Sequence, residues 1–235
     1  MHRKIMETFK KVGMYYFFGD YFDGRFYVGH LVSKTHLDTI LDAGCGTGVL
    51  LHCSDASLKI GIDISLESLK QGKLADPSLQ LIQADGTQLP FVDGYFSYIL
   101  DMHLLPEIHK FQGENWKKCG AELSRISTRD CQIIMAGANR MSRHFENAYS
   151  LESRKQYLTY KAHEDFFKDN YHMSIQGYGP HSRIVMFPLK FLFKFSDKFL
   201  DISGINKLLF KFLRSKRYLK NGRSYIIFCK KKSTQ

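Results

Sequence analysis

Short apolar runs that each end in an acidic residue alternate with helical patterns through the first half of the chain. The first run is Thr39–Leu41, which Asp42 follows; the second ends at Asp63 and the third at Asp85. Runs of this length, bounded by turn residues, are typical of buried strands. Strands that alternate with helices predict a doubly wound parallel sheet, in which the carboxyl ends of the strands meet at one edge.

The same alternation continues through the second half of the chain. Further strands are predicted at Phe96–Asp101, Cys131–Ala136, Tyr171–Gln176 and Ser224–Cys229. Helical patterns are predicted at Leu66–Lys73, where Ser65 is the N-cap, at Asn115–Ile126 and at Thr159–Lys168. The length of 235 residues suits one domain rather than two. We therefore expect a single α/β domain over residues 1–235.

A glycine-rich turn follows the first predicted strand. The residues after Asp42 are Ala, Gly44, Cys45, Gly46, Thr and Gly48, so the glycines occupy alternate positions. Glycine allows positive φ and lets a ligand lie directly against the main chain. A strand, such a turn and a helix N-terminus together form a nucleotide-binding corner. The spacing is not the G-x-G-x-x-G of dinucleotide folds, and no Lys follows as in a P-loop.

This turn resembles the first motif of class I S-adenosylmethionine (SAM)-dependent methyltransferases. A second stretch, residues 84–96, is similar to the family pattern A-D-x-x-x-L-P-F-x-D-x-x-F, although Ser97 stands where an acid usually follows. The resemblance implies a three-layer, Rossmann-like, seven-stranded and mostly parallel sheet whose last two strands run antiparallel. It also implies SAM as the cofactor and S-adenosylhomocysteine as the product.

The resemblance places the cofactor on residues at the ends of the first three strands and just beyond the fourth. Asp63 would accept both ribose hydroxyls, as its counterpart does in dinucleotide folds. Asp85 would accept from the adenine amino group. The full expected set is Asp42, Gly44, Cys45, Gly46, Gly48, Asp63, Ile64, Asp85, Gly86 and Met102.

The residues after the fourth strand are the candidates for catalysis. Substrates of doubly wound sheets react just beyond the carboxyl ends of the strands, near the topological switch point. Asp101, His103 and His109 are the best-placed titratable groups there. His103 is the candidate general base, because a neutral imidazole accepts a proton near pH 7; the alternative is that it packs or caps the next helix. The ten histidines are dispersed, so we expect no metal.

Residues 1–36 are rich in aromatic side chains interrupted by glycines, which argues against one long helix. Related enzymes often carry an N-terminal segment that folds over the cofactor as a lid. By that resemblance, Tyr16, Tyr21 and Arg25 would line the substrate or SAM pocket. The alternative is that these aromatics cover one face of the sheet.

The net charge of +11 is concentrated near the C-terminus. From residue 184 onward there are thirteen Lys and Arg against two acids, whereas the first 183 residues carry 21 of each sign. Basic and apolar positions alternate at helical spacing over residues 187–220, which predicts an amphipathic helical insertion before the last strand. Three interpretations stay open: a membrane-surface helix pair, an RNA-binding face, or a solvated face whose apolar side packs on the sheet or forms a dimer.

Composition limits the location and the acceptor. The five cysteines lack C-x-x-C spacing, and the sequence shows neither a signal-peptide core nor a membrane-spanning stretch. We therefore expect a reducing, cytoplasmic location. Peripheral attachment at the inner face of the membrane is compatible with this expectation. We expect methyl transfer to a small-molecule, lipid-linked or glycan acceptor, at oxygen or carbon, by a monomer or homodimer. The alternatives are an RNA methyltransferase and a non-catalytic SAM-binding partner protein.

Overall fold

The structure is a computed structural model that describes residues 24–140, 150–179, 214–215, 219, 222 and 224–232. Its helices are α3 (Arg25–Val32), α4 (Val49–Cys53), α5 (Leu66–Ala75), α6 (Leu104–Gln112), α7 (Asn115–Arg125), α9 (Leu151–Lys155) and α10 (Tyr160–Phe167). Its strands are β1 (Thr39–Ala43), β2 (Leu58–Asp63), β3 (Gln80–Gln83), β4 (Phe96–Met102), β5 (Ser127–Ala138), β6 (Tyr171–Tyr178), β7 (Arg214–Ser215) and β8 (Ser224–Lys231). Tyr16, Tyr21 and almost all of the expected insertion at 187–220 lie outside the described residues.

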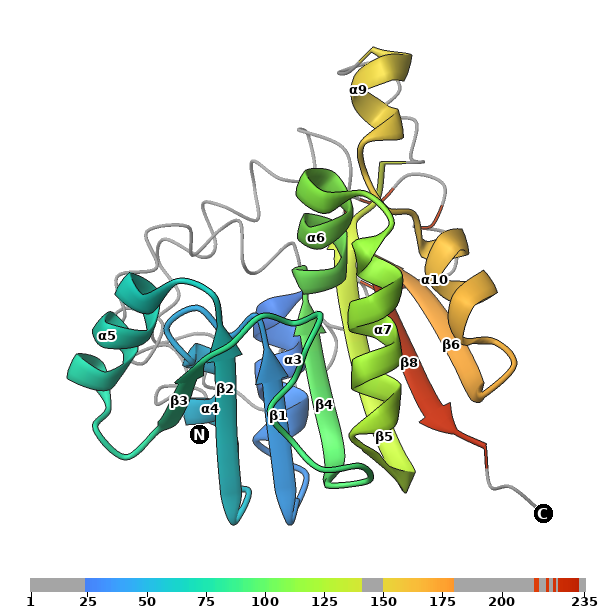
Figure 1. The fold of residues 1–235 in the computed structure, drawn as a ribbon. Coiled ribbons are helices and arrows are strands. Elements are labelled where there is room, and N and C mark those ends of the chain that lie inside the picture. The colour runs from blue at the N-terminus through green and yellow to red at the C-terminus, as the bar shows by residue number, and fades with distance from the viewer. Residues whose placement is uncertain are drawn as a thin grey trace, which may run out of the picture.

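All the described strands belong to one mixed sheet in the order β3-β2-β1-β4-β5-β8-β6-β7. The first five are parallel, and β8 lies between β5 and β6 and runs antiparallel to both (Figure 1). The expected mostly parallel α/β sheet is therefore confirmed. The number of strands differs, because the two-residue β7 pairs with the outer edge of β6 through Gly177 and Tyr178. Two residues carry no hydrophobic period, so this strand left no pattern in the sequence.

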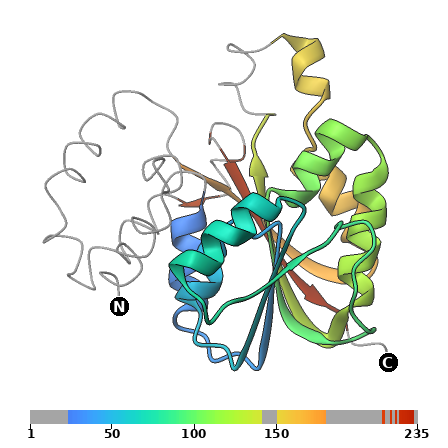
Figure 2. The same ribbon diagram turned by 60° about the vertical axis from the view of Figure 1, so that its left-hand side comes forward.

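Helices cover both faces of the sheet, as Figures 1 and 2 show. Successive residues of a strand point to opposite faces, and in β1 Ile40 joins one buried cluster while Leu41 joins the other. The first cluster packs against α3 and α4, and the second packs against α6, α7 and α10. Because both faces are buried, the central strands read in the sequence as continuous apolar runs rather than as alternating ones.

Local sequence sets the helix starts. The hydroxyl of Ser65 accepts a hydrogen bond from the Ser68 N–H at 3.2 Å, which confirms the predicted cap of α5. The hydroxyl of Thr159 caps α10 in the same way, through the Ala162 N–H at 3.2 Å. Each side chain satisfies one of the N–H groups that a helix start leaves without a partner.

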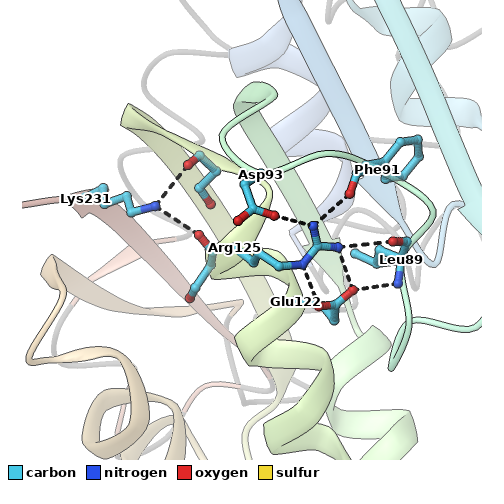
Figure 3. Close-up of polar contacts among 8 residues, drawn as sticks. Leu89, Phe91, Asp93, Glu122, Arg125 and Lys231 are labelled. Atoms are coloured by element: carbon cyan, nitrogen blue, oxygen red, sulfur yellow. Dashed lines mark hydrogen bonds and ion pairs between the residues drawn. The ribbon is translucent and has the colours of Figure 1, made fainter.

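An ion-paired arginine ties α7 to the loop that follows β3 (Figure 3). The guanidinium of Arg125 donates to the carboxylates of Glu122 and Asp93 and to the carbonyl oxygens of Leu89 and Phe91, at 2.7–3.1 Å. Glu122 in turn accepts from the Leu89 N–H at 2.7 Å. Five fixed donors let one guanidinium serve several acceptors at once. This network fixes the loop that begins just after Asp85.

Candidate cofactor site and catalytic edge

The glycine turn presents open backbone at the carboxyl end of β1. Gly44, Gly46 and Gly48 all have positive φ, of 74°, 55° and 75°. A Cβ at Gly48 would lie 2.9 Å from the Leu79 side chain, so packing as well as φ requires glycine there. A Cβ at Gly46 would meet nothing within 4 Å. The main chain at Gly46 is therefore exposed to whatever occupies the space above the turn.

The carboxylate of Asp63 is held in place by two backbone groups. One oxygen accepts from the Gly46 N–H and the other from the Ser65 N–H, both at 2.8 Å. The side chain thus joins the end of β2 to the glycine turn, and each oxygen keeps a lone pair for a further donor. The next side chain, Ile64, is 66% exposed and offers an apolar surface beside the carboxylate.

Asp85 lies beyond the end of β3 and is exposed. One of its oxygens accepts from the N–H and the hydroxyl of Thr87, at 2.8 and 2.9 Å. The following Gly86 is buried, and a Cβ there would lie 3.0 Å from the Cys119 sulfur. Asp85 is thus oriented by its own turn, while Gly86 is pressed against α7.

Two buried carboxyl groups lie behind this surface, on adjacent strands. Asp42 ends the apolar part of β1, and burial raises its pKa to about 7, with smaller contributions from the charges of Asp101 and Asp63. The guanidinium of Arg25, on α3, opposes this rise. Arg25 was expected near the cofactor, and its charge reaches Asp42.

Asp101 is fully buried and caps α6. One oxygen accepts from the N–H groups of Leu104 and Leu105, at 2.7 and 3.2 Å, and the other has no hydrogen-bond partner among the described residues. Burial raises the pKa of this carboxyl to about 7, although the two N–H donors act against the rise. With no exposed surface, Asp101 suits helix capping better than proton exchange with an acceptor.

His103 links β4 to α6 in a strained conformation. Its φ of 83° is left-handed, and no other non-glycine residue in the described part of the chain has positive φ. Burial lowers its pKa to about 3, and the charges of Arg25 and Arg140 act in the same direction. The imidazole is therefore neutral at pH 7. So low a pKa also makes it a weak base, since general bases work best with a pKa near the operating pH.

The structure does not bring the three catalytic candidates together. His109 lies six residues beyond His103 on α6, and its ring packs edge-on against Trp116 with the centroids 6.4 Å apart. It lines a separate cavity rather than the glycine turn.

Two residues expected at the cofactor are buried. Met102 lies in the cluster beneath α3 and α4. Cys45 is also buried, which raises the pKa of its thiol well above the ordinary value.

Arg140 and Tyr157 were not among the site residues predicted from the sequence. Arg140 follows β5, and its guanidinium carbon lies 3.7 Å from the centroid of the Tyr157 ring. The charge of Arg140 also reaches His103. Its place just after a strand end was the available signal, but Tyr157 lies in the segment after α9, which no motif marks.

No group of three or more His, Cys, Asp or Glu side chains among the described residues is arranged to hold a metal ion. Among the described helices, none has the length and apolar character needed to cross a membrane.

Comparison with known proteins agrees with this geometry. Residues 40–130 match the family model of a methyltransferase domain. A demethylmenaquinone methyltransferase of Renibacterium salmoninarum is 31% identical over 99 residues, which are 41% of this chain and 40% of the relative. An uncharacterized protein of Methanocaldococcus jannaschii is 31% identical over 103 residues, 44% of this chain and 42% of that protein. These matches therefore span about two fifths of the relatives' lengths.

Solved structures share the fold. A SAM-dependent methyltransferase from Thermotoga maritima aligns with a TM-score of 0.61 at 13% identity, over 97% of this chain and 99% of its own. A second, from Archaeoglobus fulgidus, aligns with a TM-score of 0.58 at 14% identity, over 93% and 100%. The fold is that of class I SAM-dependent methyltransferases. Residues 40–130, which match the methyltransferase-domain model, include the glycine turn and the strand-end acids Asp42, Asp63 and Asp85.

Proposed function

We propose that the protein transfers a methyl group from SAM to a small-molecule, lipid or glycan acceptor, at an oxygen or a carbon. The observation that carries this proposal is the carboxylate of Asp63, which the backbone of Gly46 and Ser65 holds at the mouth of the glycine turn. A carboxylate there accepts paired ribose hydroxyls. The match to a methyltransferase domain supports the same activity.

The residues present fit SAM. Open main chain at Gly46 leaves room for the methionine part, exposed Ile64 offers an apolar face for the adenine, and Asp85 has an oxygen left for the adenine amino group. Buried Asp42, with Arg25 beside it, would set the charge beneath the methionine part. When bound, SAM supplies an electrophilic methyl group, so the protein must chiefly hold the acceptor in line with it.

Neutral His103 borders the place where the acceptor would react. Because its pKa is low, we assign it mainly to positioning: it fixes the turn between β4 and α6 and keeps an uncharged surface there. One matched relative is named a demethylmenaquinone methyltransferase, whose named acceptor is not a nucleic acid. That name supports a small-molecule or lipid acceptor over RNA.

Calorimetry with SAM tests the cofactor site. Asp63→Ala should weaken SAM binding at least about a hundredfold, because paired ribose hydroxyls would lose a charged acceptor. Asp55→Ala is the matched control, since Asp55 is an exposed acid away from the strand ends, and it should bind SAM normally. Full affinity in Asp63→Ala would refute the assignment.

The acceptor class needs its own experiment. Radiolabelled SAM is incubated with the protein and a cell extract, and lipid, polysaccharide, RNA, protein and small-molecule fractions are counted separately. Label in the small-molecule, lipid or polysaccharide fraction, absent with Asp63→Ala, supports the proposal. Label confined to the RNA fraction would favour the alternative that the protein is an RNA methyltransferase.

A further inference from the structure

A groove separate from the glycine turn lies between α6, α7 and α10. It has a volume of about 690 Å³ and receives side chains from all three helices and from the segment between α9 and α10. The residues that matter for its chemistry are His109, Trp116, Lys117, Lys155, Tyr157 and Phe166. None of the residues expected at the cofactor lines it. The volume is that of a site for a small organic molecule.

Aromatic rings dominate the walls of the groove. Trp116, which is only 3% exposed, packs against Phe166 with centroids 5.2 Å apart and against His109 at 6.4 Å. Tyr157 supplies another ring from the segment between α9 and α10. Planar rings stack or meet edge to face with such walls more favourably than flexible aliphatic chains do. The lining therefore favours a planar aromatic ligand.

The charges around the groove favour an anion. Of the two acids in the lining, Glu114 forms an ion pair with Lys117, and Asp165 forms one with Lys168 at 3.0 Å. Lys155 adds a further positive charge to the lining. The ammonium of Lys110 lies 5.6 Å from the centroid of the Tyr157 ring. Among the described residues that line the groove, both acids are paired with a lysine, and no acid of the lining matches the charge of Lys155.

His109 contributes a buried ring nitrogen to the lining of the groove. The Nδ1 of His109 is buried and makes no hydrogen bond with any described residue. A buried nitrogen left in this way costs free energy unless a ligand or water meets it. In the tautomer that carries its proton on Nδ1, His109 would donate a hydrogen bond to a carboxylate oxygen of an aromatic ligand. The carboxylate would then lie at the His109 side of the groove.

The groove also adjoins the catalytic edge. His103 is the N-cap of α6 and His109 lies in its last turn, six residues further on, which is about 9 Å along the helix axis. Tyr157 is a wall of the groove, and Arg140, stacked on it, is close enough to influence His103. We propose that this groove holds the body of the methyl acceptor and that the acceptor is a planar aromatic anion, such as an aromatic carboxylate. This inference rests on the proposed methyl transfer and narrows its acceptor.

Trp116 makes the groove directly observable, because it is the single tryptophan of the chain. The full chain is titrated with benzoate, with its uncharged analogue benzamide and with the non-planar anion cyclohexanecarboxylate, while tryptophan emission is recorded. Benzoate should change the emission saturably, and the other two should bind at least about tenfold more weakly. Equal affinity for benzamide would contradict the proposed preference for an anion. The absence of a saturable change with benzoate would contradict a binding site in the groove.

Matched variants locate the binding and separate it from the cofactor site. Lys155→Gln and His109→Phe should each weaken benzoate binding several-fold, whereas Lys161→Gln, an exposed lysine of α10 outside the groove, should not. Equal loss in all three, or in none, would contradict the groove. Benzoate should also inhibit label incorporation from SAM without changing SAM affinity; binding without inhibition would overturn the acceptor role. Failure of SAM to bind at all would instead contradict the proposed function and leave the benzoate titration interpretable.

Discussion

His103 shows how a single residue can be held in a conformation that its own chemistry disfavours. A left-handed backbone costs a residue with a Cβ roughly 1–2 kcal/mol. His103 keeps it while its N–H donates to Ala136 O at 3.1 Å and its carbonyl oxygen accepts from Glu107 N–H at 3.0 Å. The turn from β4 into α6 thus overrides the local preference.

The strain at His103 predicts a difference between two small replacements. His103→Ala and His103→Gly both remove the imidazole, but only glycine adopts a φ of 83° at no steric cost. The glycine variant should therefore be more stable than the alanine variant by about 1 kcal/mol in urea unfolding. An alanine variant as stable as the glycine variant would show that the turn relaxes once the side chain is gone.

Buried Asp101 predicts a pH dependence of stability. Its pKa rises from 3.8 to about 7 on folding, so between these values the folded state keeps a proton that the unfolded state releases. The free energy of unfolding should therefore fall as the pH rises through this window, by up to about 4 kcal/mol, because one pKa unit is worth about 1.4 kcal/mol.

Asp101→Asn separates this effect from the other titrating groups. The amide keeps an oxygen for the Leu104 and Leu105 N–H groups and cannot ionise. Relative to the wild type, the variant should gain stability steadily from about pH 4 to pH 7 and level off above, as measured by urea unfolding at several pH values. A constant difference across the range would mean that the carboxyl is not buried as described.

At this scale the sequence predicted positions that follow from the strand ends. Asp42 and Asp63 could be placed at strand ends because each ends a short apolar run, and the Ser65 cap could be predicted because it precedes a helical pattern. The contact between Arg140 and Tyr157 could not be predicted, because it joins residues on either side of α9 that share no motif. Nothing local in a sequence encodes such a stacking.

At the level of elements, Arg125 replaces the regular hydrogen bonds that the loop after β3 lacks. Arg125→Lys should lower the free energy of unfolding by about 1–2 kcal/mol, because an ammonium cannot serve Leu89 O, Phe91 O and two carboxylates from one plane. Hydrogen exchange of residues 89–93 should accelerate more than that of the central strands.

An exposed ion pair provides the control for Arg125. Lys168 pairs with Asp165 at 3.0 Å on the surface of α10, and both side chains are more than half exposed. Lys168→Ala should change stability by less than about 0.5 kcal/mol. Comparable losses in the two variants would mean that the Arg125 network contributes no more than a surface pair.

Strands and helices were predicted correctly where the spacing of apolar residues and the length of the run indicated the same kind of element. The strands from β1 to β6, and β8, fall where the apolar runs lie, although β5 extends from Ser127 to Ala138 rather than over the expected core alone. Helix α6 was not delimited in advance, because its N-terminus is capped by Asp101 from within the preceding strand. A cap three residues before the helix is not the usual sequence signal.

For the whole molecule, the membrane-surface interpretation of the uneven charge makes a testable prediction. We expect the chain to sediment with vesicles that contain anionic lipid, because each basic side chain near such a surface contributes about 1 kcal/mol and apolar side chains at 187–220 add burial. Replacing Phe191, Phe193 and Phe195 together by Ser should abolish sedimentation at moderate salt. Unchanged sedimentation of that variant would contradict a membrane-surface helix pair that inserts its apolar side chains, and a steep salt dependence with RNA would favour the RNA-binding interpretation.

The position of β8 has a consequence for how the protein is made. During synthesis β6 leaves the ribosome before β8, yet among the described strands β6 is joined to β5 only through β8. While residues 224–231 are still inside the exit tunnel, β5 lacks its antiparallel neighbour, and the two-residue β7 is the single described strand that could already pair with β6. Open edges invite pairing with other chains. Nascent chains of this protein should therefore depend on chaperones that bind exposed strands until the last eight-residue strand emerges and closes the sheet.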